Sequence, residues 1–357
     1  MYPRVMRLRD VARDKCDAPC YLLTVASHFS WKRPELAIDF GTANLRVIGR
    51  DEGIILDEPS LCCFAHIDTA PSLHAAGIAA QAMVDRTPGK LQIRRPLARG
   101  VLQDIDAATH LLRYAVRKAR GRKHFRAPHA MIGVPADATQ AERGALMTAA
   151  HDAGLGSVRL VAEPFAAALG ASLPIDAPTG TMIVECGAGT TEVAVLSLGG
   201  ICVTRSVRVG GATLDKAIAD HLHFKHKFLA GELTSEQLKL GYAENRRNDA
   251  AKDETIEVKG RSLATGLPAA LALPLTELDR VAEKHFQQII DAVREVLGGT
   301  PPELSQDIHE RGIILTGGSA ATPLLGAMIG SETGLAVAVA DEPARCVARG
   351  LHQMLFD

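Results

Sequence analysis

The sequence predicts an α/β protein whose two similar halves surround a central cleft, and three observations support this fold class. Strand-like and helix-like segments alternate along most of the chain. A short hairpin pattern, made of an apolar strand, an acid, a glycine-containing turn and a second strand, occurs twice. The chain of 357 residues is also too long for one ordinary core, and it fits two domains of about 150 to 200 residues.

The two hairpins are "AIDFGTANLRVI" at residues 37–48 and "IVECGAGTTEVAVL" at residues 183–196. Their acids, Asp39 and Glu185, lie about 146 residues apart, and each precedes the first glycine of its turn by two residues. A single hairpin of this kind indicates no more than a tight turn, because glycine supplies positive φ in many turns. The repetition predicts a duplication, with one hairpin in each half.

The rest of the first half reads as strands and helices in alternation. "GIILDEPSLCCFA" is strand-like, and a mixed Ala/Gly segment continues to about Gly100. A helix follows in "DIDAATHLLRYAVRKA", where Asp104 or Asp106 is placed to begin it. A strand, a turn at Pro135 and a helix are then expected within "HAMIGVPADATQAERGALMTAAHDAG". "VRLVAEPFAAALGASL" predicts a strand that runs into a helix with Pro164 in its first turn, where proline is tolerated.

The second half repeats this alternation less clearly. After the hairpin we expect a helix near residues 214–223, the segment "GELTSEQLKLGYA", a polar stretch and a long helix over about residues 275–297. "RGIILTGGSAATPLLGAMI" predicts a strand, a glycine turn and a helix, and the C-terminal "LAVAVADEPARCVARGLHQML" predicts a strand, a loop and a helix. Residues 1–34 are basic, match nothing in the second half, and indicate a flexible arm or a start codon assigned too early.

Composition and cysteine usage favour a cytoplasmic globular protein. The formal charge is −1, with 47% hydrophobic and 23% charged residues, so no global field attracts nucleic acid and no nucleic-acid partner is expected. No apolar run reaches the roughly 18 residues of a membrane span, and the first residues lack the apolar core of a secretory signal. Four cysteines (Cys62, Cys63, Cys186 and Cys202) lie in apolar, strand-like contexts typical of buried free thiols. Cys16 and Cys20 could pair or bind metal, although no second Cys/His pair at suitable spacing supports a metal site.

The chemistry of the two turns favours a polyphosphate ligand. A turn almost bare of side chains lets backbone N–H groups approach a phosphate chain, and threonine hydroxyls add hydrogen bonds. The acid before each turn can hold a metal ion or its waters. Two such turns that face each other would grip a nucleoside triphosphate from both sides.

Several segments together resemble the actin-like ATPase superfamily and, within it, the MreB family of bacterial cytoskeletal actin homologues. The phosphate turns match in "DFGTAN" and "GAGTTEVAVLSLGG", and the adenosine-side turn matches in "GIILTGGSA". The segments "GVPADATQAERGAL", "AEPFAAALGASLP", "VKGRSLATGLP" and "TPPELSQDIHERGIILTGG" are also similar to MreB. The resemblance extends from about Leu36 to the C-terminus.

The resemblance implies an actin-like ATPase fold, in which two duplicated RNase H-like domains enclose a nucleotide cleft and each carries a small subdomain. The implied divisions are 35–62, 104–178 and 334–357 for subdomain IA, 63–103 for IB, 179–213 and 270–333 for IIA, and 214–269 for IIB. Residues 1–34 form the N-terminal arm in this scheme.

The resemblance also implies ATP and Mg²⁺ as cofactors, and it indicates which residues would bind them. Nucleotide contacts fall on Gly41, Thr42, Ala43 and Asn44 in the first turn, on Ala188, Gly189 and Thr190 in the second, on Glu236, Gln237, Leu238 and Lys239 near ribose and adenine, and on Gly317, Gly318, Ser319 and Ala320 under the adenosine. Asp39 and, through water, Glu185 would serve the metal, and Glu163 would position the attacking water. Two of these assignments have a simpler interpretation. An acid such as Glu163 in the first turn of a helix suits the helix dipole, and Glu/Lys pairs at the spacing of Glu236 and Lys239 are common on helix surfaces.

Some residues depart from the family pattern. Glu185 stands where MreB ordinarily has Asp, Ala188 where it often has Gly, and Ser319 is the third member of the adenosine turn. Ala212 replaces a usual acid, while Asp215 remains. Small residues still permit close backbone approach, so nucleotide binding is expected to survive, whereas Glu185 puts hydrolysis in doubt.

One basic segment bears on membranes. "RYAVRKARGRKHFRAP", residues 113–128, concentrates cationic residues around Phe125, where the resemblance places a membrane-inserting loop with two adjacent apolar residues. Here the neighbour of Phe125 is His124. Basic charge near anionic lipid contributes about 1 kcal/mol per residue and could replace the missing apolar side chain. The alternative is a solvated helix end, because cations suit a helix C-terminus.

The resemblance implies an ATPase that forms homopolymer filaments on the inner face of the cell membrane and organises cell-wall synthesis and rod shape with the wall elongation machinery. Its hydrolysis would be slow and regulatory. Two alternatives remain at this point: a magnetosome-type actin-like filament, and a sugar or carboxylate kinase of the same superfamily. The chain lacks the sizeable insertions with which such a kinase would build its substrate pocket.

Overall fold

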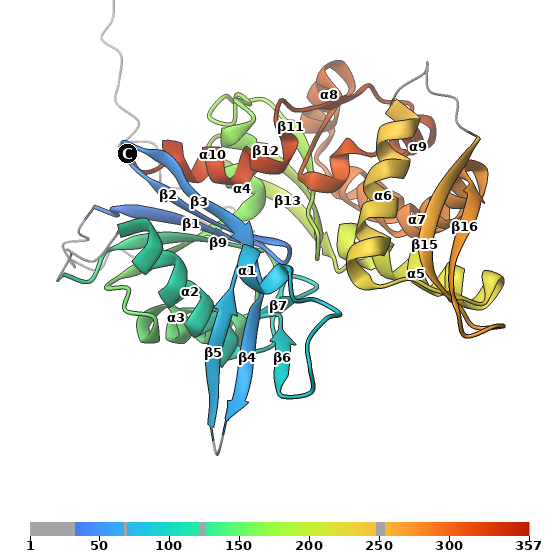
Figure 1. Cartoon of the computed structure of the whole chain (residues 1–357). Helices are drawn as coiled ribbons and strands as arrows, with labels where there is room; N and C mark the ends of the chain where they lie inside the picture. The colour runs from blue at the N-terminus through green and yellow to red at the C-terminus, as the bar shows by residue number, and fades with distance from the viewer. Residues whose placement is uncertain (1–32, 68–69, 121–125, 248–253, 357) are drawn as a thin grey trace, which may run out of the picture.

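Two five-stranded sheets with the same strand order form the two halves of the molecule (Figure 1). The computed structural model describes residues 33–67, 70–120, 126–247 and 254–356. The first sheet runs β10-β9-β1-β2-β3 and contains β1 (Leu36–Phe40), β2 (Asn44–Gly49), β3 (Gly53–Pro59), β9 (Ala130–Val134) and β10 (Val158–Ala162). The second runs β18-β17-β11-β12-β13 and contains β11 (Thr181–Cys186), β12 (Thr191–Ser197), β13 (Gly200–Val207), β17 (Ile313–Thr316) and β18 (Val337–Val339).

The duplication extends to strand direction and irregularities. In each sheet the three strands of the hairpin region pair antiparallel, and the remaining two strands add in parallel beside the first hairpin strand. Each sheet also has one bulge between its second and third hairpin strands, at Val47/Ile48 and at Val195/Leu196. The predicted duplication of an α/β unit is therefore confirmed.

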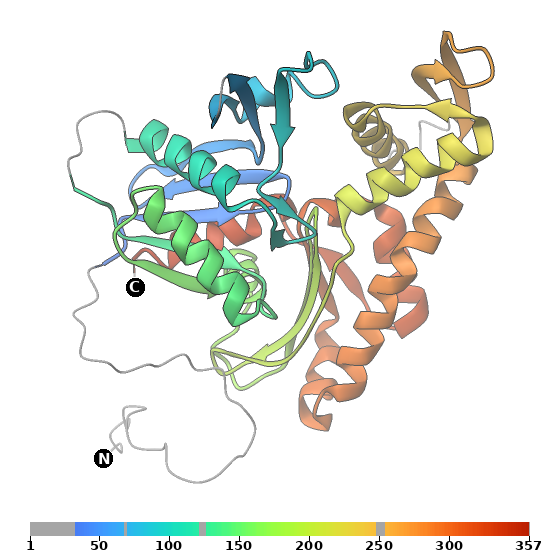
Figure 2. The same ribbon diagram turned by 90° about the horizontal axis from the view of Figure 1, so that it is seen from below.

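Helices cover both faces of each sheet. Helices α2 (Ile105–Arg120) and α3 (Gln140–Asp152) lie side by side over one face of the first sheet (Figure 2). Helices α5 (Gly211–His226), α7 (Leu275–Gly299) and α9 (Pro323–Thr333) cover one face of the second. The short helices α4 (Glu163–Gly170) and α10 (Cys346–Gln353) lie between the two sheets and pack against both. Both faces of the central strands are thus buried, which explains why β1 and β11 are apolar apart from their acids.

The contact between α4 and α10 brings two backbones together. A Cβ at Gly170 would lie 2.6 Å from the nitrogen of Gly350 and still closer to the carbonyl oxygen of Cys346. Conversely, a Cβ at Gly350 would lie 2.6 Å from the carbonyl carbon of Ala166. Neither glycine has room for a side chain, so the two helices touch at their main chains.

A three-stranded sheet extends each half. One consists of β4 (Cys62–Ile67), β5 (Ala70–Ala76) and β6 (Leu91–Arg94), and the other of β14 (Phe228–Leu229), β15 (Thr255–Ser262) and β16 (Pro268–Pro274). The remaining elements are α1 (Ile78–Gln81), β7 (Leu97–Ala98), β8 (Val101–Leu102), α6 (Glu232–Arg247), α8 (Pro302–Arg311) and two 3₁₀ turns, Gly318–Ala321 and Pro343–Arg345. The subdomain boundaries themselves stay a prediction.

Of the two acids expected to begin α2, Asp104 does so, because its Oδ1 accepts a hydrogen bond of 2.9 Å from the Ala107 nitrogen. The expectation for Cys202 was wrong, since it lies exposed on β13, whereas Cys62, Cys63 and Cys186 are buried. Among the described helices, none combines the length and apolar content that crossing a bilayer requires. The predicted N-terminal arm up to residue 32, with Cys16 and Cys20, and the loop residues His124 and Phe125 lie outside the described residues.

Candidate functional site

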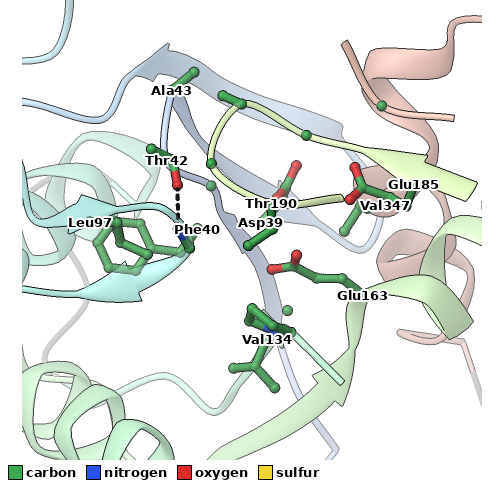
Figure 3. Close-up of a pocket in the computed structure, with 18 of the residues that line it drawn as sticks. Asp39, Phe40, Thr42, Ala43, Leu97, Val134, Glu163, Glu185, Thr190 and Val347 are labelled. Carbon is green, nitrogen blue, oxygen red and sulfur yellow. Dashed lines mark hydrogen bonds between the residues drawn. The ribbon is translucent and has the colours of Figure 1, made fainter. Parts of the chain in front are cut away.

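The two hairpin turns face each other across a cavity of about 160 Å³ between the halves (Figure 3). Its lining contains Gly41, Thr42, Ala43 and Asn44 from the first turn, and Ala188, Gly189 and Thr190 from the second. The carboxyl groups of Asp39, Glu163 and Glu185 approach the same space from three different elements. The structure therefore brings together residues that are far apart in the sequence.

The second turn has no room for a side chain at its closest point to the first half. A Cβ at Gly189 would lie 2.6 Å from the Gly100 nitrogen and closer still to Thr42 Oγ1. The Gly100 nitrogen donates a hydrogen bond of 3.1 Å to Thr42 Oγ1, drawn as a dashed line in Figure 3. Backbone groups of both turns can consequently approach one ligand, as phosphate-binding turns require.

The acid of the first hairpin is paired with a cation. Asp39 lies opposite Arg46 in the β1/β2 register, and Arg46 Nη1 is 2.8 Å from Asp39 Oδ2. Arg46 Nε also lies 3.1 Å from Asp57 Oδ1. Burial raises the pKa of Asp39, and the Arg46 charge opposes that shift. The first half therefore supplies a carboxylate whose charge is already partly balanced.

The acid of the second hairpin lies opposite another acid. Glu185 and Glu192 are direct partners in the β11/β12 register, so their side chains lie on the same face. Glu192 is fully buried, and its Oε1 accepts hydrogen bonds from the Ala136 nitrogen at 2.8 Å and from Ser206 Oγ at 2.7 Å. Its Oε2 is buried with no hydrogen-bond partner among the described residues. The sequence analysis missed Glu192, although its position is symmetric with Glu185 about the turn.

Glu163 completes a cluster of three carboxyl groups. It is the first residue of α4, and Glu163, Glu185 and Glu192 each offer an oxygen within 4.8 Å of the others. Burial and the nearby charges of Glu192 and Glu185 raise the pKa of Glu163 well above its ordinary value. Burial, with help from Glu192 and Asp39, raises the pKa of Glu185 to about 8, and burial raises that of Glu192 to about 7. Like charges this close cannot all ionise without a compensating cation.

This donor set fits Mg²⁺. Carboxylate oxygens are the ligands that this hard cation prefers, and the buried Oε2 of Glu192, which has no hydrogen-bond partner among the described residues, can accept one from a water on such an ion. Strand alternation places Glu185 toward the cavity, while Val184 and Cys186 point into the apolar core. The cavity is thus lined by buried acids whose ionised forms would be unfavourable without a compensating partner.

A second cavity of about 470 Å³ adjoins the first and is also lined by both halves. Glu236, Lys239 and Asp215 line it. Lys239 Nζ lies 2.9 Å from Asp215 Oδ2 and donates a hydrogen bond of 3.2 Å to the Gly211 carbonyl oxygen. Burial raises the pKa of Asp215 to about 6, against the lowering effect of Lys239, and Asp215 Oδ1 is buried without a partner among the described residues. An acceptor of this kind can receive a hydrogen bond from a ligand.

Most of the predicted nucleotide residues line the two cavities. These are Gly41, Thr42, Ala43, Asn44, Ala188, Gly189, Thr190, Glu236, Lys239, Gly317, Gly318 and Ser319. Gln237 is exposed on α6, whereas Leu238 and Ala320 are buried in the apolar core. None of these three residues lines either cavity. For Gln237 and Leu238 the reason is that α6 presents only one of its faces to the cavity, whereas Ala320 packs inward from the 3₁₀ turn Gly318–Ala321.

Arg208 is a further cavity residue that the sequence analysis missed. It follows β13 in the second half and lies 3.4 Å from Asp137 and 3.9 Å from Glu142 of the first half. Its charge also lowers the pKa of Glu142. Arg208 therefore links the halves beside the carboxyl cluster, and no local sequence pattern indicates this contact.

The family model described as MreB/Mbl protein matches residues 33–357. The chain belongs to the MreB/Mbl family. It is 39% identical over 319 residues to the cell shape-determining protein MreB of Escherichia coli strain K12, covering 88% of this chain and 91% of that one. It is 37% identical over 321 residues to the cell shape-determining protein Mbl of Bacillus cereus, with coverage of 90% and 95%.

Solved structures support the same assignment. MreB5 of Spiroplasma citri bound to AMPPNP matches with a TM-score of 0.81 and 31% identity, covering 89% of this MreB/Mbl chain and 95% of that one. A MamK double helical filament matches with a TM-score of 0.74 at 22% identity, with coverage of 90% and 98%, which bears on the fold alone. The predicted actin-like fold is confirmed.

We expect the metal-free, nucleotide-free MreB/Mbl protein to lose stability as pH rises from about 5 to 8. The pKa of Glu185 is about 8 in the folded protein against an ordinary value of 4.5, so between these values the native state holds a proton that the unfolded chain releases. Stability therefore falls with rising pH across this window. Thermal melts in EDTA at several pH values measure the effect, and Glu185→Gln should flatten the profile. An equal slope in both proteins would contradict the raised pKa.

Proposed function

We propose that this MreB/Mbl chain binds ATP with Mg²⁺ in the cleft, polymerises, and helps to determine cell shape as a slow ATPase. One observation carries the proposal: two glycine turns, one from each half, meet across a cavity, and a second cavity adjoins the first at these turns. Phosphates would lie between the turns, and the ribose and base beside Glu236 and Lys239. The related Spiroplasma citri MreB5 is described with AMPPNP and with ADP bound.

Asp39 and Glu185 would hold Mg²⁺ or its waters, and the ion would neutralise phosphate charge when it is bound. Backbone N–H groups of the turns would cradle the phosphate chain. Thr42 and Thr190, which line the phosphate cavity, would add hydroxyl contacts. These residues bind and orient the nucleotide, so catalysis would rest on positioning and electrostatics.

Glu163 would orient the attacking water. Its position at the first turn of α4 fixes the side chain beside the cavity, and its carboxyl group points toward the space between the turns (Figure 3). To accept the hydrogen bond of the water, Glu163 must be ionised. Burial and the charges of Glu192 and Glu185 oppose this by raising the pKa of Glu163, and the Arg208 charge only partly offsets that rise. Hydrolysis would be slow because the carboxyl cluster favours protonation of Glu163.

Membrane attachment and work with the wall elongation machinery belong to the same proposal, since the named relatives are cell shape-determining proteins. Filament formation is testable by sedimentation of the purified protein with ATP, ADP or no nucleotide. We expect pelleting with ATP only above a critical concentration, and filaments by electron microscopy. A protein that stays in the supernatant with ATP at every concentration would contradict polymerisation. Phosphorylation of sugars or carboxylates without pelleting would favour the kinase alternative.

The described part of the basic segment is largely engaged within the protein. Arg113 Nη2 donates a hydrogen bond to the Asp152 carbonyl oxygen, Lys118 pairs with Glu58, and Arg120 Nη2 lies 3.1 Å from Glu35 Oε2. Lys118 and Arg120 lie in the last turn of α2, where cations suit the helix dipole, but both are paired rather than simply solvated. The charges that remain for a membrane are Arg117 and Arg126, which are exposed, and those of the residues outside the described part of the chain.

We expect binding to anionic liposomes to fall steeply with added salt, because Debye screening weakens exposed charges. Phe125→Ser should lower it further by removing the apolar side chain of the loop. Co-sedimentation at several salt concentrations measures both effects, with neutral vesicles as the control. Binding that ignores salt, and persists after Phe125→Ser and removal of the loop charges, would locate attachment in the N-terminal arm instead.

A further inference from the structure

A cluster of two histidines and one glutamate lies at the end of α5 farthest from the cleft. His221 and His226 each direct Nε2 at Glu277 Oε1, at 2.5 Å in both cases. The three ligand atoms lie within 4.8 Å of one another. The two rings are 5.7 Å apart at 64°, so each reaches the carboxylate from its own direction. In Figure 2 the far end of the yellow helix α5 meets the start of the orange helix α7, where this cluster forms.

We propose that His221, His226 and Glu277 form a site for a divalent transition metal, with Zn²⁺ as the best-fitting ion. Two imidazole nitrogens and one carboxylate oxygen are a recurrent three-ligand set for Zn²⁺, which takes water or another ligand in its fourth position. The side chains are 22%, 21% and 12% exposed, so the ligands are held by packing and an ion can still enter from solvent. The site is unrelated to the acids of the cleft, which suit Mg²⁺.

Lys225 acts as the competitor of the metal. Its Nζ lies 3.0 Å from Glu277 Oε1, the atom that both histidines also contact. The Lys225 side chain is 53% exposed, so it can move into solvent when an ion arrives. Burial raises the pKa of Glu277, but hydrogen bonds from the two histidines and the lysine outweigh burial and lower that pKa to about 2. The carboxylate is consequently ionised whether or not a metal is present.

A bound ion would tie the C-terminal end of α5 to the first turn of α7. Helix α5 has 16 residues and spans about 24 Å, and its first turn carries Gly211 at the second cavity. The ion would therefore act on the helix that forms one wall of that cavity, from its opposite end. We assign the ion a structural role, since neither cavity of the cleft includes a residue of the cluster.

The test is Zn²⁺ titration of the full-length, EDTA-treated and desalted protein by isothermal calorimetry. We expect one site with micromolar or tighter affinity. His226→Ala and Glu277→Gln should each weaken it on the order of 100-fold, because one of three protein ligands is lost. His223→Ala is the matched control, since His223 lies on the same helix but makes an edge-to-face contact with Phe224 instead, and the variant should bind normally. Lys225→Met should tighten binding about tenfold by removing the competing charge.

Co²⁺ substitution distinguishes this site from binding by cysteines. Nitrogen and oxygen ligands give a weak visible ligand-field spectrum, whereas thiolates add strong near-ultraviolet charge transfer. Affinity unchanged in His226→Ala and Glu277→Gln, an equal loss in His223→Ala, or a thiolate spectrum would overturn the proposal. The Lys225→Met variant keeps the test decisive if either ligand variant fails to fold, because weaker or unchanged binding there contradicts the competition.

Discussion

Glu163→Gln should lower steady-state phosphate release by about 10²-fold or more and leave nucleotide affinity nearly unchanged. The amide keeps the size of the side chain but is a poorer acceptor for the attacking water. The turns that would hold the phosphates are untouched, since Gly41 and Ala188 belong to other elements. Phosphate release at matched polymer mass and fluorescent-nucleotide titration measure the two quantities separately.

Glu303→Gln provides a matched control. Glu303 occupies the first turn of α8, just after Pro302, much as Glu163 adjoins Pro164 in the first turn of α4. It is exposed and far from the cavities, so its loss reports only the helix-dipole contribution of a first-turn acid. Wild-type hydrolysis by Glu163→Gln, or an equal loss in Glu303→Gln, would remove Glu163 from the mechanism.

Glu185→Asp should hydrolyse ATP faster than the natural chain, by up to about 10²-fold. The longer side chain reaches the neighbouring turn after β17, because a Cβ at Gly317 would lie only 2.7 Å from Glu185 Oε1. An aspartate would withdraw the carboxyl group by about one bond length toward β11. Mg²⁺ tolerates little distortion of its octahedral shell, and a misplacement near 1 Å can cost about 10²-fold in rate without abolishing binding.

Steady-state phosphate release from both proteins at matched polymer mass is the measurement. Glu185→Gln serves as the contrast, because it keeps the length and removes the charge, and we expect it to be slower than the natural chain. If Glu185→Asp is equal or slower, the glutamate is either an adapted ligand or not a ligand, and this account of the hairpin acid fails.

Contacts near a turn are predictable from the sequence by counting outward from it. Asp39 meets Arg46 and Glu185 meets Glu192 because each pair is symmetric about its glycine turn. The two hairpins therefore share a backbone plan but differ in charge, with a cation opposite the acid in one and a second acid in the other. This difference can be predicted from the sequence, because Arg46 and Glu192 occupy the positions symmetric with the two acids.

Helical period explains why only two of the four predicted residues on α6 line the cavity. Glu236 and Lys239 are three positions apart and share the face that lines the second cavity, whereas Leu238 is rotated into the core and Gln237 toward solvent. A four-residue block taken from a family resemblance ignores this rotation. Arg208 could not be predicted in this way, since its partners come from the other half and no sequence periodicity relates them.

The glycine contact between α4 and α10 couples two positions outside the cavity to one that lines it. Helix α10 also packs on β1, the strand that carries Asp39. Main chains that touch at Gly170 and Gly350 leave no layer of side chains to absorb a change in spacing. Glu163 lies at the other end of the same eight-residue helix, about 10 Å from the contact. A side chain at either glycine would therefore push α4 away from α10 and shift Glu163 relative to Asp39, although neither glycine lines the cavity.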